Sequence, residues 1–135
     1  MSRGEGLVKA LLGLHVLVVD DDHDARELLE SVLTYCGAFV TLAASAREGV
    51  EAFRRHVPDA VVSDIAMPGE DGYWLVAQLH GLTGDAPRVP VVALTAFGRE
   101  HGPDRALSAG FQAHLCKPVD PWELCRLLAR LARKA

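Results

Sequence analysis

The stretch from residue 60 to residue 72 reads Ala60-Val61-Val62-Ser63-Asp64-Ile65-Ala66-Met67-Pro68-Gly69-Glu70-Asp71-Gly72, and it decides the fold. Its first four residues form a short, largely apolar run, which is typical of a strand buried on both faces of a parallel sheet. Asp64 follows at the carboxyl end of that strand, the edge at which open α/β sheets bind ligands. Because Pro68, Gly69 and Gly72 favour turns, the chain must turn over the carboxylate before the next helix.

Three other apolar runs end in polar side chains in the same way. Residues 15–19 end in Asp20-Asp21-Asp22, residues 90–94 end in Thr95, and residues 113–116 end in Lys117-Pro118. The carboxyl ends of parallel strands share one edge of a sheet. We therefore expect that edge to bring together Asp20, Asp21, Asp64, Thr95 and Lys117.

Helical patterns separate these runs and the remaining strand at residues 39–42. The first helix is predicted from Asp24, with apolar residues including Leu28 on one face, to a stop at Gly37. A capping box at residues 45–48 predicts the start of the second helix, whose apolar side includes Val57 and which Pro58 ends. The third helix is predicted from the turn at residues 71–72 until Gly81 and Gly84, and the fourth over residues 104–109. A proline-containing start at residues 120–123 predicts the fifth.

Five strands that alternate with five helices predict an α/β fold with right-handed crossovers. The expected architecture is a flavodoxin-like (βα)5, doubly wound parallel sheet with strand order 2-1-3-4-5, enclosed by helices as a three-layer sandwich. In that order Asp20, Asp21 and Asp64 lie at the switch point between the first and third strands. Residues 14–132 form the expected domain, and residues 1–13 are expected to be a leader or linker.

The composition is typical of a soluble globular protein and argues against several other classes. The 135 residues are 50% hydrophobic and 24% charged, with a net charge of −4, so no basic footprint for nucleic acid is present. No apolar run approaches the length of a membrane span, and no signal peptide is recognisable. The three cysteines lack metal-type spacing, which favours reduced thiols and a cytoplasmic location. Among them, Cys116 is expected to be a small buried side chain.

A cluster of carboxylates at one sheet edge needs a cation. Two carboxylates about 5 Å apart repel each other by about 3 kcal/mol at an effective dielectric constant near 20. Hard oxygen ligands favour Mg²⁺, with Mn²⁺ as a possible substitute, over zinc. A carboxylate beside a divalent ion, an ammonium group and a hydroxyl is suited to attack a phosphoryl group and to form an acyl phosphate.

Five motifs together resemble the receiver domains of bacterial response regulators. They are residues 18–22 (VVDDD), 63–68 (SDIAMP), 71–72 (DG), 94–96 (LTA) and 116–118 (CKP), in family order and at family spacing over about residues 14–132. The resemblance implies a two-component phosphorelay module in which Asp64 accepts a phosphoryl group. The implied donor is a histidine kinase or a histidine phosphotransfer domain.

The same resemblance implies a role for each matching residue. Asp21, Asp64 and the Ala66 backbone carbonyl would bind Mg²⁺, with Asp20 helping through water. Thr95 would be the switch hydroxyl and Lys117 the phosphate partner, with a cis Lys117-Pro118 peptide bond. His114 stands where the family often has an aromatic switch residue, so it is a possible switch.

Alternative functions use the same fold. A Mg²⁺-dependent small phosphohydrolase with an aspartyl-phosphate intermediate needs a general acid two residues after the nucleophile, where this chain has Ala66. A nucleotide or flavin binder needs a phosphate loop, and none is recognisable. A degenerate receiver acting as a scaffold conflicts with the complete acidic set.

The expected protein is a signalling module rather than an enzyme. It would be monomeric or weakly dimeric, with an unidentified protein partner and no contact with nucleic acid or membrane. Phosphorylation would shift the surface formed by residues 104–109, residues 113–116 and the helix that opens at Pro121. Both a stand-alone receiver and a receiver from a hybrid sensor kinase agree with the sequence.

Overall fold

A five-stranded parallel sheet forms the centre of the molecule. The computed structural model describes residues 5–83, 89–95 and 103–132. The strands are β1 (His15–Val19), β2 (Phe39–Ala43), β3 (Ala60–Asp64), β4 (Val91–Thr95) and β5 (Ala113–Cys116), in the order β2-β1-β3-β4-β5. The predicted order is therefore confirmed.

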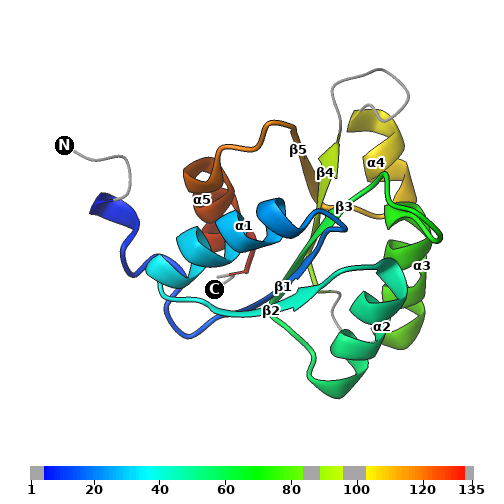
Figure 1. Cartoon of the computed structure of the whole chain (residues 1–135), viewed down its shortest axis with the longest axis horizontal. Coiled ribbons are helices and arrows are strands. Elements are labelled where there is room, and N and C mark those ends of the chain that lie inside the picture. Colours follow the sequence, from blue (N-terminus) through cyan, green and yellow to red (C-terminus); the bar gives the residue numbers. More distant parts are fainter. Residues whose placement is uncertain (1–4, 84–88, 96–102, 133–135) are drawn as a thin grey trace.

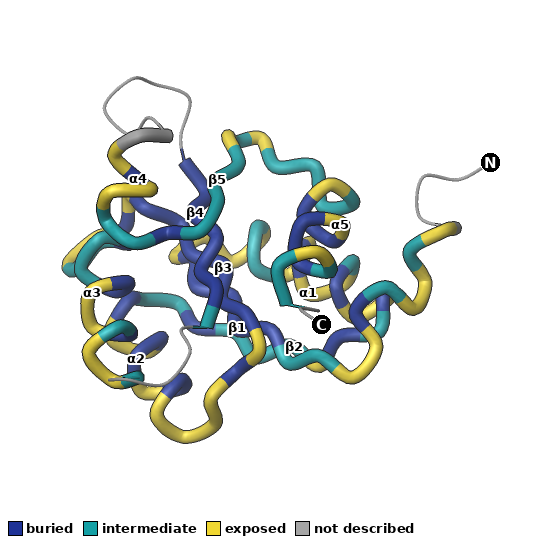
Figure 2. Tube along the Cα trace, turned by 180° about the vertical axis from the view of Figure 1, so that it is seen from behind, coloured by how far each residue is buried: buried dark blue, intermediate teal, exposed yellow. Residues whose placement is uncertain are grey.

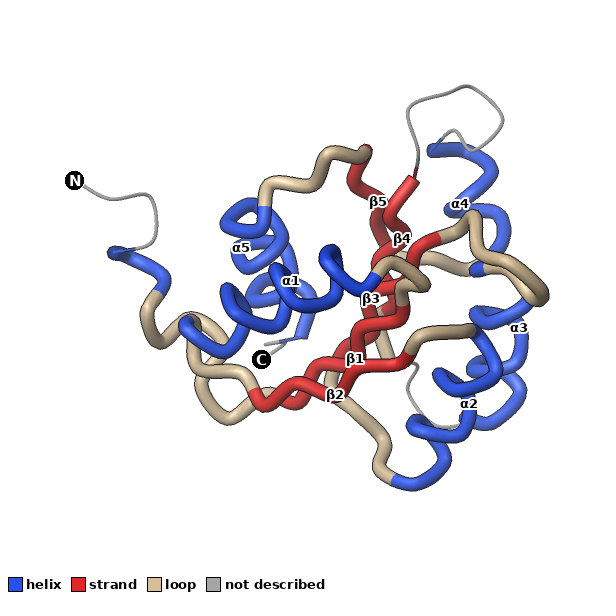
Figure 3. The backbone as a smooth tube through the Cα atoms, in the orientation of Figure 1, coloured by secondary structure: helices blue, strands red, loops and turns tan. Residues whose placement is uncertain are grey.

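Helices cover both faces of this sheet, which confirms the three-layer architecture. The helices α1 (His23–Tyr35) and α5 (Pro121–Ala132) lie on one face, and α2 (Ala46–Arg55), α3 (Gly72–Thr83) and α4 (Pro103–Ala109) lie on the other (Figure 1). Figure 3 shows the strands as a twisted layer between the two helical groups. Each face has its own hydrophobic core, in which Leu17 and Phe53 pack on the α2 side and Val18 and Leu33 pack on the α1 side.

The three inner strands carry the most deeply buried backbone. Every residue of β3 and β4 is buried, and in β1 only His15, the first residue, is partly exposed. Figure 2 shows this buried centre beneath helices whose outer sides are exposed. A strand packed on both faces cannot alternate polar and apolar residues, which explains the continuous apolar runs in the sequence.

Side-chain caps fix where three of the helices begin. Ser45 Oγ accepts from the Glu48 backbone N–H at 3.1 Å, and the Glu48 carboxylate accepts from the Ala44 backbone N–H at 2.9 Å. Asp120 accepts from the Trp122 N–H at 3.0 Å. The predicted starts of α2 and α5 are thus confirmed, whereas α1 begins one residue earlier than predicted because Asp22 caps it.

Three helix predictions were wrong in detail. Leu28 is 53% exposed, because it lies about 100° around the helix from the buried Leu29 and so falls at the margin of the apolar stripe. Val57 is exposed and lies beyond α2, which ends at Arg55. Gly81 does not break α3, which continues to Thr83. The predicted stop at Gly84 lies outside the described residues.

The segment before β1 packs on the domain. A short 3₁₀ helix, η1 (Glu5–Leu7), is followed by Leu11, which is fully buried and whose backbone N–H donates to the Cys36 carbonyl at 2.9 Å. Gly37, which has a positive φ of 102°, lies against this segment, and a Cβ at Gly37 would lie 3.0 Å from the Leu12 backbone. Part of the expected leader therefore contributes to the core on the α1 and α5 side.

The described helices include none that is long and apolar enough to cross a lipid bilayer.

Leu11 and Leu12 offer a matched test of this packing. Leu11→Ala should lower the free energy of unfolding by about 2–4 kcal/mol, because it leaves a cavity at a fully buried side chain. Leu12→Ala should change it by less than about 0.5 kcal/mol, because Leu12 is 58% exposed. Urea denaturation of the two variants and the unmodified chain measures both values. Equal, small effects would show that residues 1–13 are a dispensable leader.

Candidate functional site

The five polar residues predicted from the sequence lie at the carboxyl edge of the sheet, and Asp20, Asp21, Asp64 and Lys117 come together there. Lys117 follows β5 and places its Nζ 3.0 Å from Asp64 Oδ2 at the end of β3. The same Nζ lies 3.6 Å from Asp20 Oδ2, directly after β1. Thr95 ends β4, the strand between β3 and β5, and its carbonyl accepts from the Lys117 backbone N–H at 2.8 Å. Four strands thus contribute to one small charged site.

Most of these groups are withdrawn from solvent. Asp20 is 0%, Asp64 4% and Thr95 1% exposed, whereas Asp21 faces the solvent. Oxygen atoms of Asp20, Asp21 and Asp64 all lie within 4.8 Å of one another. Buried carboxylates are costly unless a cation or hydrogen-bond donors compensate them. Lys117 supplies part of that compensation.

Burial and neighbouring charges shift the pKa values of Asp64 and Lys117. Burial raises the pKa of Asp64, the hydrogen bond and charge of Lys117 lower it, and the charges of Asp20 and Asp21 raise it further, so the net direction is upward. Burial tends to lower the pKa of Lys117, but its hydrogen bond to Asp64 and the charges of Asp64 and Asp20 hold it above the usual value. Lys117 is therefore a fixed positive charge, and the negative charge around Asp64 is not fully compensated.

The backbone beside Asp20 fixes the orientation of its carboxylate. Oδ1 of Asp20 accepts from the Asp22 backbone N–H at 2.9 Å, and the Asp20 carbonyl accepts from Arg26 Nη1 at 2.7 Å. Oδ2 of Asp20 is buried and has no hydrogen-bond partner in the described structure, although it faces Lys117. The sequence gives no signal for the role of Arg26, because an arginine in the first turn of a helix usually faces solvent.

The loop after Asp64 is held against the strand by Gly72. Its N–H donates to the Ile65 carbonyl at 2.9 Å, and a Cβ on Gly72 would lie 2.7 Å from the Asp64 carbonyl oxygen. This contact fixes the loop that carries Ala66, which is exposed beside the acidic cluster. The sequence predicts the turn at Gly72 but not the close approach that requires glycine there.

The switch candidate Thr95 has a partner that the sequence does not predict. Its Oγ1 donates to the Cys116 sulfur at 3.7 Å. Cys116 is exposed, so the expectation that it is buried was wrong; the cause is its position at the last residue of edge strand β5. The Lys117-Pro118 peptide bond that follows is cis.

His114 lies two residues before Cys116 on β5 and is partly buried. It lines a groove of about 580 Å³ between α4, β5 and α5, together with Leu107, Gln112, Arg126 and Arg130. The possible switch residue therefore borders the surface that phosphorylation is expected to change. Ala96, the last residue of the quoted LTA motif, lies outside the described residues.

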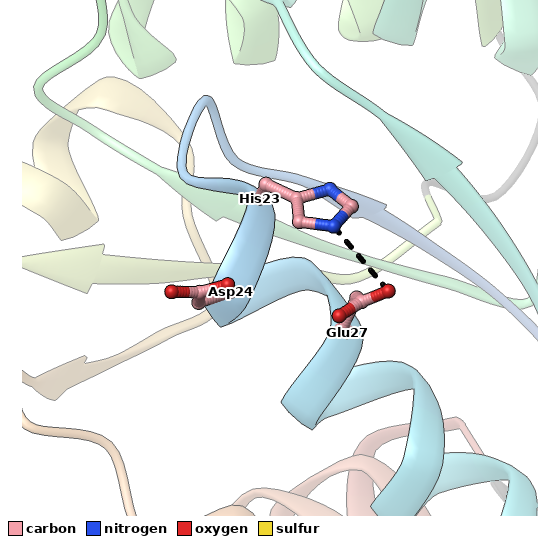
Figure 4. Close-up of side chains that lie close together, drawn as sticks. All are labelled: His23, Asp24 and Glu27. Carbon is pink, nitrogen blue, oxygen red and sulfur yellow. Dashed lines mark ion pairs between the residues drawn. The ribbon is translucent and has the colours of Figure 1, made fainter.

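A second group of potential ligands lies on the first turn of α1, outside the sheet edge. His23 Nε2 pairs with Glu27 Oε2 at 3.3 Å, four residues along the helix, with Asp24 beside them (Figure 4). All three side chains are exposed. The His23–Glu27 pair is an ordinary i, i+4 contact on a helix surface, worth a few tenths of a kcal/mol (~0.3).

The sheet-edge cluster fits a hard divalent cation. Its donors are carboxylate oxygens, one of which, Asp20 Oδ2, is buried without a hydrogen bond. All-oxygen donor sets with few protein ligands suit Mg²⁺, which keeps several of its waters. Neither a histidine nor a cysteine belongs to this group, so zinc is disfavoured.

Comparison with known proteins gives one consistent result. The family model described as "Response regulator receiver domain" matches residues 16–129. An uncharacterised 14.6 kDa protein of Leptolyngbya boryana is 43% identical over 90% of this chain and 92% of its own length. Response regulator Rre1 of Synechocystis is 38% identical over 87% of this chain, which spans only 51% of that protein's length.

Solved structures agree with this comparison. A receiver domain of a sensor histidine kinase from Pseudomonas aeruginosa, with a magnesium ion coordinated in its active site cleft, has a TM-score of 0.80 and 32% identity over 90% of this chain and 99% of its own. The signal receiver domain of a histidine kinase from Syntrophus aciditrophicus has a TM-score of 0.80 and 28% identity, over 91% and 96% of the two chains.

Two glycines of α3 test the role of the close approach behind Asp64. Gly72→Ala should lower the free energy of unfolding by about 1–3 kcal/mol, because its Cβ would meet backbone atoms of Asp64 and Ile65 at 2.7 and 2.8 Å. Gly81→Ala should leave it unchanged or raise it by up to about 1 kcal/mol, because nothing lies within 4 Å of that Cβ. Urea denaturation compares them; a Gly72→Ala protein as stable as Gly81→Ala would contradict this role.

Proposed function

The chain belongs to the response regulator receiver domain family, and on that premise we propose that Asp64 is its phosphoacceptor. The contact that carries the proposal is the 3.0 Å hydrogen bond from Lys117 to Asp64 within a group of three carboxylates. A receiver is a module of two-component signalling, so the phosphoryl group comes from a histidine kinase or a histidine phosphotransfer domain. The kinase that phosphorylates this chain is unidentified.

The proposed reaction is a transfer between nitrogen and oxygen. An Asp64 carboxylate oxygen forms the new bond to phosphorus while the bond from phosphorus to the donor's imidazole nitrogen breaks. The electron pair of that bond stays on the nitrogen. Asp64 is suited to this attack because it is almost fully buried, so little water competes for its oxygens. Lys117 stays positively charged and pairs with the oxygens of the incoming group.

We assign the metal ligands to Asp21, Asp64 and the backbone carbonyl of Ala66, with Asp20 acting through water. Mg²⁺, or Mn²⁺ in its place, would neutralise charge on the transferring oxygens when bound. The buried Oδ2 of Asp20, which has no hydrogen-bond partner among the described residues, supports this assignment. Burial is the main cause of the raised pKa of Asp64, and the charges of Asp20 and Asp21 raise it further, so a bound cation would favour its carboxylate form.

Thr95 is the proposed switch hydroxyl. It lies at the end of β4 beside Lys117, where it can turn to donate to a phosphoryl oxygen on Asp64. That movement would change the packing around the groove between α4, β5 and α5, which His114 lines. Phosphorylation would then shift the population between two packings of this surface and control an unidentified protein partner.

A small phosphohydrolase is not favoured. Such an enzyme would need a general acid two residues after the nucleophile, and Ala66 has no acidic group.

We propose a signalling module whose only chemistry is its own phosphorylation and dephosphorylation. It would act in the cytoplasm as a monomer or weak dimer, without direct contact to nucleic acid or membrane. The matched part of this chain spans only 51% of the length of response regulator Rre1. The proposed receiver domain covers residues 14–132.

Substitution of Asp64 tests the acceptor. Incubation with acetyl phosphate and Mg²⁺ should add one phosphate to the unmodified chain, as measured by intact-protein mass spectrometry, and none to Asp64→Asn. Asp24→Asn is the matched control, because Asp24 is an exposed carboxylate on α1 outside the sheet-edge cluster. It should be phosphorylated like the unmodified chain. A full phosphate on Asp64→Asn would exclude Asp64 as acceptor.

Substitution of Asp21 tests the metal site. Asp21→Asn should weaken Mg²⁺ binding by at least about tenfold in calorimetric titration, because it removes one charged ligand from the cluster. Asp21 is exposed, so the fold should tolerate the change. Chelation with EDTA should also abolish phosphorylation by acetyl phosphate. Unchanged affinity in Asp21→Asn, or equal weakening in Asp24→Asn, would contradict the assigned ligands.

A further inference from the structure

Cys116 is the cross-strand neighbour of Thr95. In the parallel pairing of β4 with β5, Thr95 lies opposite Cys116. The hydroxyl of Thr95 donates to the Cys116 sulfur at 3.7 Å, and the backbone hydrogen bond from Lys117 to the Thr95 carbonyl, 2.8 Å long, fixes the two strand ends together. The sulfur therefore holds a defined position beside the hydroxyl.

The Thr95 hydroxyl has only one proton to donate. While it donates to sulfur it cannot donate to an oxygen of a phosphoryl group on Asp64. Thr95 is 1% exposed, so water is a poor third partner. A buried hydroxyl that loses its partner is destabilised. The resting arrangement is consequently stabilised by the thiol, and the phosphorylated arrangement must give up that contact.

We propose that Cys116 is a positioning residue that holds the Thr95 hydroxyl in the resting state and so sets how readily this receiver becomes phosphorylated. Cys116 acts through Thr95 and does not itself touch the phosphoryl group. This inference rests on the proposed function, because it requires Asp64 to be the acceptor and Thr95 to be the switch.

The surroundings of Cys116 make it suitable for substitution. Cys36 directly after α1 and Cys125 on α5 are fully buried, and burial together with the side-chain hydrogen bond between the two thiols raises the pKa of Cys125. Cys116 is exposed, so its truncation leaves no core cavity. A change in phosphorylation in a Cys116 variant would therefore not arise from a loosened core.

The test compares rates of phosphorylation by acetyl phosphate and Mg²⁺, followed by intact mass. Cys116→Ala should be phosphorylated about threefold faster than the unmodified chain, the size expected for removal of one weak hydrogen bond from the resting state. Cys116→Ser retains an acceptor and should stay close to the unmodified rate. In a Thr95→Val background, the same Cys116→Ala change should have no effect on the rate.

Three results would overturn the inference. One is a Cys116→Ala rate equal to that of the unmodified chain, and another is a rate increase that persists in the Thr95→Val background. The third is an unmodified chain that takes up no phosphate on Asp64. That result would overturn the proposed function as well, whereas the first two leave it intact, so the two failures are distinguishable.

Discussion

The ion pair between Lys117 and Asp64 is the interaction on which the rest of the site depends. Three carboxylates come within 4.8 Å at the sheet edge, and two of them are buried. Such a group is unfavourable by itself, because each buried charge loses its hydration. Lys117 lies 3.0 Å from one carboxylate and 3.6 Å from another, which stabilises both without neutralising the whole cluster. The remaining negative charge gives this edge the chemistry that suits a divalent cation, which is the basis of the proposed phosphoacceptor role of Asp64.

The fold converts sequence positions far apart into this arrangement. Parallel strands bring their carboxyl ends to one edge, so residues that follow β1, β3, β4 and β5 become neighbours. Apolar side chains on both faces hold the strands rigidly, while the polar ends remain at the rim. Local contacts then refine each position: Arg26 holds the Asp20 carbonyl, and Gly72 allows the following loop to lie against Asp64. The same edge places the Thr95 hydroxyl beside the Cys116 sulfur and joins the Thr95 carbonyl to the Lys117 backbone N–H.

The sequence predicted the sheet order and the members of the site for a physical reason. Four of the five apolar runs end in polar side chains, and parallel topology brings those ends to one edge of the sheet. The details that it missed depend on distances across the fold. Leu28 has the spacing of a core residue but lies at the margin of the apolar stripe, and Cys116 belongs to an apolar run but is the exposed last residue of edge strand β5. The contacts of Arg26 and Gly72 depend on how the chain turns directly after β1 and β3, which the residue types alone do not specify.

The most direct test of the account is to locate the phosphoryl group chemically. An acyl phosphate on aspartate is reduced by borohydride to homoserine, which tandem mass spectrometry distinguishes from aspartate at a single residue. After phosphorylation in the presence of Mg²⁺, the account predicts homoserine at position 64, with the other carboxylates of the cluster unchanged. Homoserine at position 20 or 21, or a phosphate that resists borohydride because it is not an acyl phosphate, would contradict it.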